Sequence, residues 1–83
     1  MSIATGLYRH YKGQHYRVLG IARHSETSQE LVLYQALYGD YGLWVRPLAM
    51  FADTVEVEGK PIPRFALAET LPAAFVQADR NTP

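Results

Sequence analysis

Aromatic and basic side chains gather in residues 38–47, whose sequence is YGDYGLWVRP. Alternation along a strand places Trp44 and Arg46 on one face, and in the preceding strand Tyr34 and Tyr38 also share a face. Aromatic rings beside a guanidinium form a stacking surface for bases, peptide prolines or other planar groups. The pattern therefore predicts a ligand-binding surface composed of these four side chains.

The same stretch also has a purely structural explanation. The chain has one tryptophan, and a single tryptophan is usually mostly buried. The alkyl stem of Arg46 would then cover the ring of Trp44. Gly39, Asp40 and Gly42 are typical of a tight turn, in which the carboxylate bonds the local backbone. The sequence leaves open whether Trp44 lies in the core or at the surface.

The motif ARHSET, residues 22–27, contains the residue types that a hydrolase uses. Successive side chains of an extended chain point apart, so these neighbours do not form a catalytic triad. One explanation is a loop whose hydroxyls bond backbone N–H groups and whose acids pair with Arg23. The other is a polar clamp beside the aromatic surface, in which Arg23 binds an anion and His24 titrates near neutrality. No catalytic residue is predicted.

Histidines suggest a weak metal-binding pattern in the first hairpin. With a two-residue turn at Lys12-Gly13, His10 and His15 face each other with Cα atoms about 4.5 Å apart and could share a divalent ion. A bulged turn instead places Arg9 opposite His15 and separates the pair. Residues 1–24 contain no carboxylate that could join them. We therefore predict no metal site and no cofactor.

Basic residues are unevenly distributed along the chain. The net charge is zero, but residues 1–24 carry four basic and no acidic side chains, while residues 25–83 carry all eight acids. A local cationic face attracts anionic ligands, which suggests RNA binding by the N-terminal hairpin as an alternative function. The zero net charge weakens this alternative, because phosphate contacts normally dominate such affinity. The candidate residues are Arg9, Lys12, Arg17 and Arg23.

Length and composition exclude several classes of protein. The chain of 83 residues is one domain, and 48% hydrophobic residues exclude a disordered chain. It contains no cysteine, which excludes disulfides, thiolate nucleophiles and zinc fingers. No apolar run approaches the ~20 residues of a membrane span, and residues 1–10 lack a signal-peptide core. We expect a cytoplasmic protein.

Alternating residues and turn signals predict strands almost throughout the chain. Tight turns are expected at Gly13, at residues 39–42 and at Glu58-Gly59, and a helical turn is expected to start at Pro47. Five or six short strands of this kind predict an all-β fold, a small antiparallel barrel of SH3-like scale, with its core in residues 6–69.

The barrel interior is expected to be the leucine-rich face. On the third strand Leu31, Leu33 and Leu37 share one side, and on the fourth Leu43 and Val45 match it. This arrangement leaves the tyrosine face as the outer, ligand-binding one.

The tail of residues 70–83 is compatible with an amphipathic helical stretch from Pro72.

The alternating direction of backbone N–H groups in the last hairpin predicts a sheet edge that cannot pair with another strand. With a turn at Glu58-Gly59, the positions of Pro61 and Pro63 both point away from the partner strand, where no N–H is needed. No proline guards the strands near residues 6–11 or 31–38. Because unguarded edges promote strand pairing, we expect a homodimer in which the tail or one of these edges packs on a second copy.

Several phrases of the sequence resemble the bacterial family known as domain of unknown function 1653. They are KG at residue 12, ARHSET at 22, ALYG at 36, WVRP at 44 and MF at 50, and the likeness runs from about residue 6 to 65. The resemblance implies a small stand-alone bacterial protein and brings no activity with it.

The interpretation we favour is a non-catalytic binding module for a peptide, nucleotide or small anion. Its predicted site residues are Trp44, Arg46, Tyr38 and Tyr34, with Arg23 and His24 from the neighbouring loop. The alternatives are the RNA binder described above and a small enzyme or metal protein built on the histidines.

Overall fold

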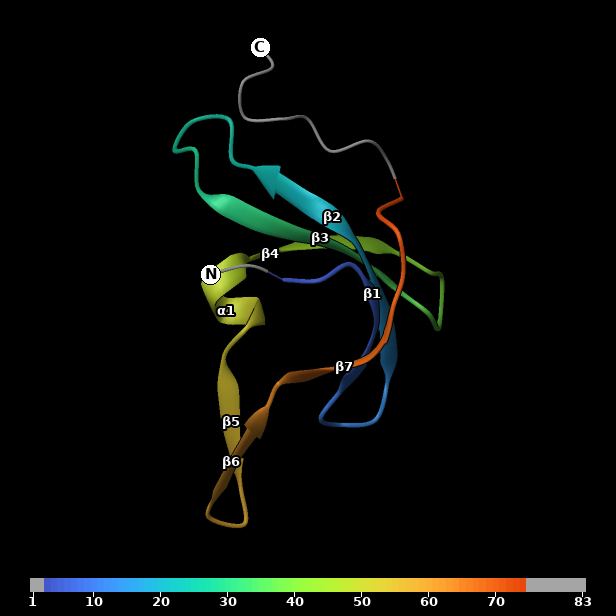
Figure 1. The fold of residues 1–83 in the computed structure, drawn as a ribbon, viewed down its shortest axis with the longest axis vertical. Coiled ribbons are helices and arrows are strands. Elements are labelled where there is room, and N and C mark those ends of the chain that lie inside the picture. Colours follow the sequence, from blue (N-terminus) through green and yellow to red (C-terminus); the bar gives the residue numbers. More distant parts are fainter. Residues whose placement is uncertain (1–2, 75–83) are drawn as a thin grey trace.

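The computed structural model describes residues 3–74, which form seven strands and one helical turn (Figure 1). Strand order and pairing define a five-stranded antiparallel sheet, β4-β3-β2-β1-β7, and a separate hairpin of β5 and β6. The elements are β1 (Gly6–His10), β2 (His15–Arg23), β3 (Glu30–Ala36), β4 (Leu43–Pro47), α1 (Leu48–Phe51), β5 (Thr54–Val57), β6 (Lys60–Pro63) and β7 (Phe65–Thr70).

The all-β class and the helical turn after Pro47 are confirmed, but the sheet does not close into a barrel within residues 3–74. Its two edges, β4 and β7, are not paired with each other. Between them the chain makes α1 and the β5–β6 hairpin, which extends away from the sheet (Figure 1). Side chains cover the opening instead, because Phe51 of α1 stacks on Phe65 of β7 with ring centroids 4.2 Å apart.

The core lies on the tyrosine face of β3, so the expected leucine-lined interior is wrong. Val32 and Tyr34 are buried, whereas Leu43 and Val45 on the opposite face are 62% and 57% exposed. Both faces of β3 are apolar, and periodicity alone does not say which of them is covered. We call the covered side the inner face and the other side the outer face. The buried core cluster is Tyr8, Val18, Val32, Tyr34, Leu48, Phe51 and Phe65.

The first hairpin has a bulged turn. Gly13 N–H donates to the His10 carbonyl oxygen at 2.7 Å, and His10 N–H donates to the Gln14 carbonyl oxygen at 2.7 Å. Gly13 has a φ of 107°, a conformation that suits glycine. This turn places Arg9 opposite His15 and not His10, so the second of the two turn geometries expected from the sequence is the one that forms.

The β5–β6 hairpin confirms the blocked edge. Glu58 and Gly59 have φ of 53° and 79°, as a two-residue turn requires, and Val57 pairs with Lys60. Pro61 and Pro63 therefore occupy positions whose backbone nitrogen points away from β5, where no N–H donor is needed. The pairing of β5 with β6 ends at Pro63, and after Arg64 the next strand, β7, pairs with β1.

Residues 71–74 continue along the sheet without forming a helix. Leu71 N–H donates to the Thr5 carbonyl oxygen, and Ala74 N–H donates to the Leu19 carbonyl oxygen, both at 3.0 Å. The rest of the expected C-terminal helical stretch lies outside the described residues. Within residues 3–74 no helix is long and apolar enough to span a membrane.

Gly6 sits where β1 and β7 approach each other closely. Its φ is 147°, and a Cβ at this position would overlap the carbonyl oxygen of Glu69 and lie 2.9 Å from the Leu71 nitrogen. We expect Gly6→Ala to lower the free energy of unfolding by about 2–4 kcal/mol, because overlap and backbone strain add. Urea denaturation followed by far-UV circular dichroism measures this.

Gly39→Ala is the matched control for Gly6→Ala. Gly39 has a φ of 62° but nothing within 4 Å of an added Cβ. It should cost only the backbone strain, about 1–2 kcal/mol. Equal losses for the two variants would contradict the close approach at Gly6.

Candidate ligand-binding surface

Aromatic rings form a continuous group on the inner face, running from β1 and β2 to α1 and β7. Tyr16 lies at its centre, and its ring meets those of Tyr34, Tyr38 and Phe65 edge-on with centroids 5.5 Å apart in each case. Edge-to-face contacts of this kind add to the energy of burial and fix ring orientation. We call the group the aromatic cluster: His10, Tyr16, Tyr34, Tyr38, Phe51 and Phe65.

Arg46 reaches across the aromatic cluster from the edge strand β4. It stands opposite Val32, and its guanidinium carbon lies 5.7 Å from the centroid of Phe65 on β7. Within residues 3–74, no carboxylate pairs with it and it makes no side-chain hydrogen bond, whereas Arg64 is bound to Asp53 at 2.7 Å. A guanidinium held on an aromatic ring with unused N–H donors is suited to binding a planar anion.

The charged groups of residues 3–74 that act on His10 are basic, although one of them, Arg64, is paired with Asp53. Burial lowers the pKa of His10, and the nearby Arg64, Lys12 and Arg46 lower it further. Its ring is neutral at pH 7 as a result and lies 4.9 Å from the centroid of Phe65. Lys12 and Arg46 are thus the basic groups near His10 that are not paired with a carboxylate within residues 3–74.

Tyr16 and Tyr38 share one hydrogen bond between their hydroxyl oxygens, 2.6 Å apart. Burial and this bond raise the pKa of Tyr16 to about 12, so it is protonated at neutral pH. One hydroxyl hydrogen is used between the two oxygens. The hydroxyl that accepts this bond keeps its own hydrogen, which can be donated to a ligand.

The raised pKa of Tyr16 predicts a loss of stability in alkali. The folded pKa of about 12 exceeds the ordinary value of 10. The stabilising effect of burying neutral Tyr16 is therefore complete below pH 10 and is lost as the pH rises through 12. We expect urea denaturation to show a steeper decline for the wild type in this window than for Tyr16→Phe. The exposed Tyr41→Phe should decline like the wild type, and three identical slopes would contradict the assignment.

Trp44 lies at the surface, which settles the alternative that the sequence left open. Its side chain is 59% exposed on the inner face of β4, opposite Tyr34. Tyr38 and Tyr41 from the β3–β4 turn are also exposed. The predicted surface is therefore present in part: Tyr38, Trp44 and Arg46 share the inner face around the aromatic cluster.

Tyr34 belongs to the support of this surface and not to its exposed part. The residue is 7% exposed and its ring packs against Phe51 and Phe65. Four members of the cluster were missed as site residues by the sequence interpretation: His10, Tyr16, Phe51 and Phe65. Alternation from Tyr8 would have placed His10 on the core face, but only the strand register brings Phe65 opposite it.

The β2–β3 loop, which carries the expected clamp, is remote from Tyr38, although Arg23 lies toward the end of the sheet where Arg46 stands opposite Val32. Arg23 and His24 lie at one end of β3 and Tyr38 at the other (Figure 1). Arg23 stands opposite Glu30 in the ladder. The loop closes on itself, with Glu26 N–H donating to His24 Nδ1 at 3.1 Å and Gln29 N–H donating to Thr27 Oγ1 at 3.2 Å.

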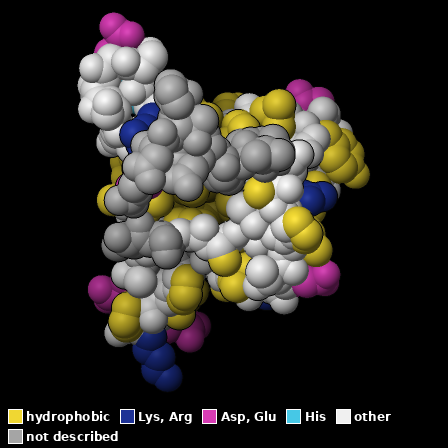
Figure 2. All heavy atoms as spheres, turned by 45° about the horizontal axis from the view of Figure 1, so that its top comes forward, with side chains coloured by type: hydrophobic (Ala, Val, Ile, Leu, Met, Phe, Trp, Pro, Cys, Tyr) yellow, Lys and Arg dark blue, Asp and Glu magenta, His cyan; other side chains and the backbone are white. Residues whose placement is uncertain are grey.

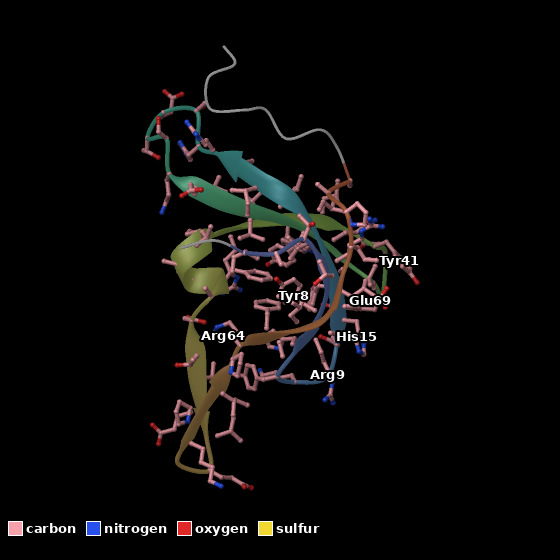
Figure 3. All side chains as sticks on the ribbon, in the orientation of Figure 1. Tyr8, Arg9, His15, Tyr41, Arg64 and Glu69 are labelled. Atoms are coloured by element: carbon pink, nitrogen blue, oxygen red, sulfur yellow. The ribbon has the colours of Figure 1, made fainter. Side chains whose placement is uncertain are left out.

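The basic residues of the first hairpin are spread over several sites. Arg9 lies opposite His15 on the outer face, away from the buried ring of Tyr8 (Figure 3). Arg17 shares that face, but its Nη2 donates to the Pro72 carbonyl oxygen at 3.4 Å and its Nε is buried. Lys12 is in the turn and Arg23 at the far end of β2. The outer face thus carries Arg9, His15 and Arg17 rather than one patch of four basic residues.

The histidines do not assemble a metal site within the described part of the chain. Because of the bulged turn, His10 faces the aromatic cluster and His15 the outer face. No group of three or more His, Cys, Asp or Glu side chains suited to a metal ion occurs in residues 3–74.

Comparison with known proteins identifies the family. The family model described as "Protein of unknown function (DUF1653)" matches residues 6–67. The chain belongs to the DUF1653 family. The crystal structure of a DUF1653 protein from Bordetella bronchiseptica is similar, with 40% sequence identity and a TM-score of 0.76, covering 86% of this chain and 94% of that one. A comparison with curated proteins gives no match.

The candidate surface lies within the part of the chain that matches the DUF1653 family model. The whole aromatic cluster, Trp44 and Arg46 fall inside residues 6–67. Residues 71–74, which bond to Thr5 and to Leu19 of β2, lie beyond it. The resemblance inferred from the sequence is confirmed, and it leaves the function to be argued from the geometry.

Proposed function

We propose that this DUF1653 protein is a non-catalytic binding module for a planar ligand that carries an anionic group, such as a nucleotide. One observation carries the proposal: Arg46 lies over the ring of Phe65, and no carboxylate within residues 3–74 pairs with it. Charge-assisted hydrogen bonds from such a guanidinium favour phosphate or carboxylate. Exposed Trp44 offers a face on which the planar part stacks.

A binding role fits this surface better than catalysis. His10 is the titratable group of the cluster closest to a general base, but the charged groups acting on it are Arg64, Lys12 and Arg46. No carboxylate orients its ring in the described residues, since Asp53 binds Arg64. The tyrosine hydroxyls, with Tyr16 protonated at neutral pH, serve as hydrogen-bond donors.

Trp44 provides the direct test, because it is the single tryptophan of the chain and lies at the surface. Its fluorescence should change saturably on titration with adenosine or uridine 5′-monophosphate. Adenosine and inorganic phosphate, which each offer half of the proposed ligand, should bind more weakly. Phosphotyrosine and benzoate extend the panel to other planar anions. If no planar anion binds at millimolar concentration, the proposal is wrong.

RNA binding by the outer face is the second candidate function. Its support is the placement of Arg9, His15 and Arg17 on one face. We expect single-stranded RNA to bind with a steep salt dependence if this face is used, because counterions are released from phosphates. A joint Arg9→Ala, Arg17→Ala variant would then lose RNA binding while Arg46→Ala keeps it. Negligible RNA affinity at about 50 mM salt, where such contacts are strongest, would eliminate this candidate.

A further inference from the structure

Strand β4 is a sheet edge with large apolar side chains on both of its sides. Leu43, Trp44 and Val45 are each more than half exposed. Leu43 and Val45 lie on the outer face and Trp44 on the inner face. Figure 2 shows hydrophobic side chains at the surface of the molecule, with only isolated charged groups among them. Edge strands usually carry charge, bulges or proline against pairing, and in β4 these features are confined to its last two residues, Arg46 and Pro47.

The hydrogen-bond parity identifies which backbone groups of β4 point outward. Ala36 N–H donates to the Gly42 carbonyl oxygen at 3.0 Å. Bonds alternate along an antiparallel pair, so Trp44 and Arg46 bond to β3. The N–H and C=O groups of Leu43 and Val45 therefore point away from β3, and within the described residues no strand pairs with them.

We propose that two copies of this protein associate by antiparallel pairing of β4 with β4, about a two-fold axis that passes beside Trp44. Leu43 of each copy then pairs with Val45 of the second copy. In this register, every outward N–H and C=O group of these two residues is bonded. The two Trp44 side chains meet at a non-hydrogen-bonded position, where side chains lie closest.

Two neighbouring groups select this register over shifted ones. A shift in one direction requires an N–H from Pro47, which proline lacks. A shift in the other direction requires Tyr41 N–H, which already donates to the Tyr38 carbonyl oxygen at 3.1 Å. Only the register that pairs Leu43 with Val45 requires neither of these two N–H donors.

A second copy matches this edge better than a different partner. A strand added to β4 must present apolar groups on both faces of a short segment, because Leu43 and Val45 are on one side and Trp44 is on the other. The sequence Leu-Trp-Val of a second β4 supplies this pattern in two-fold symmetry. Residues 41–45 contain no charge that would repel its own copy. Trp44 belongs to both the proposed ligand surface and this interface, whereas Leu43 and Val45 on the outer face belong to the interface alone.

Proline substitution provides the first test. Val45→Pro removes an outward N–H and leaves the bonds to β3 in place. We expect sedimentation at about 10–100 μM, where dimers of micromolar affinity are populated, to show a dimer for the wild type. The dissociation constant should rise at least tenfold for Val45→Pro. Leu43→Lys, at an exposed side chain, should act in the same direction without altering the backbone.

Leu67→Pro on the other sheet edge is the matched control. Tyr11 N–H donates to the Arg64 carbonyl oxygen, so by alternation Leu67 also points its N–H away from its neighbour strand. The Leu67→Pro variant should leave the dissociation constant of the dimer unchanged. A wild type that is monomeric at 100 μM, or a dimer that persists in Val45→Pro and Leu43→Lys, would overturn the proposal. So would a dimer lost only on deletion of residues 75–83.

Cysteine cross-linking tests the register itself. The chain has no native cysteine, so single-cysteine variants report one distance each. Paired Cα atoms at a non-hydrogen-bonded position are about 4.5 Å apart, within the range of a disulfide. Trp44→Cys should therefore form a covalent dimer on oxidation. Leu43→Cys, whose two copies are diagonal at about 7–8 Å, should not. The reverse result would contradict this pairing.

Discussion

Replacing Phe51 with alanine should lower the free energy of unfolding by about 3–5 kcal/mol, the usual cost of removing a buried phenylalanine. The side chain is 1% exposed. Its ring stacks on Phe65 at 4.2 Å and meets Tyr8 and Tyr34 edge-on at 5.4 Å. It fills the opening between β4 and β7 that the backbone leaves unpaired. Small domains have about 5–15 kcal/mol in total, so the loss is a large fraction of the stability.

Met50→Ala is the control for this prediction. Met50 precedes Phe51 in the same helical turn but is 52% exposed. Its replacement should cost less than about 0.5 kcal/mol, as is usual at the surface. Urea denaturation followed by circular dichroism compares the two. Similar losses would show that α1 does not close the core through Phe51. Phe51→Ala should also weaken ligand binding, because Phe65 loses the ring that holds it beneath Arg46.

Local signals predicted most of the strands and turns, since they depend on neighbouring residues. Glycine and the β-branched pattern placed the hairpins, and the parity of Pro61 and Pro63 followed from the turn at Glu58-Gly59. The inner face could not be predicted in this way. Leu33 and Tyr34 present apolar groups on opposite sides of β3, and the choice between them depends on Phe51 and Phe65, which are distant in sequence.

In the candidate site, too, the local features could be predicted from the sequence and the long-range contacts could not. Trp44 and Arg46 were predicted to share a face because they are two residues apart, and they do. Their joining with His10 and Phe65 depends on the pairing of β1 with β7, which no local pattern encodes. Arg23 and His24 were placed beside this surface because they precede β3, but the length of the strand separates them from Tyr38.

Arg46→Ala should weaken the binding of adenosine 5′-monophosphate by about 10- to 150-fold. A hydrogen bond to a charged group contributes about 1.5–3 kcal/mol, and 1.4 kcal/mol corresponds to a factor of ten. The binding of adenosine should change much less, because it lacks the anion. Arg46→Lys should retain only part of the affinity, since an ammonium keeps the charge but does not donate in a planar fork. Trp44 fluorescence measures all of these constants.

Trp44→Ala separates stacking from charge and requires NMR titration, because the fluorophore is removed. We expect it to weaken the binding of adenosine and of its monophosphate by similar factors, about 5- to 150-fold at the 1–3 kcal/mol of a base–aromatic stack. Lys60→Ala, on the exposed β6 strand of the hairpin, should alter neither. If Trp44→Ala and Lys60→Ala behave alike while Arg46→Ala also leaves affinity intact, the inner face is not the ligand-binding surface. The Trp44→Ala comparison should be repeated in the Val45→Pro background, in which pairing through β4 is blocked. The same loss of affinity is expected there, because stacking on a single copy does not require the second one.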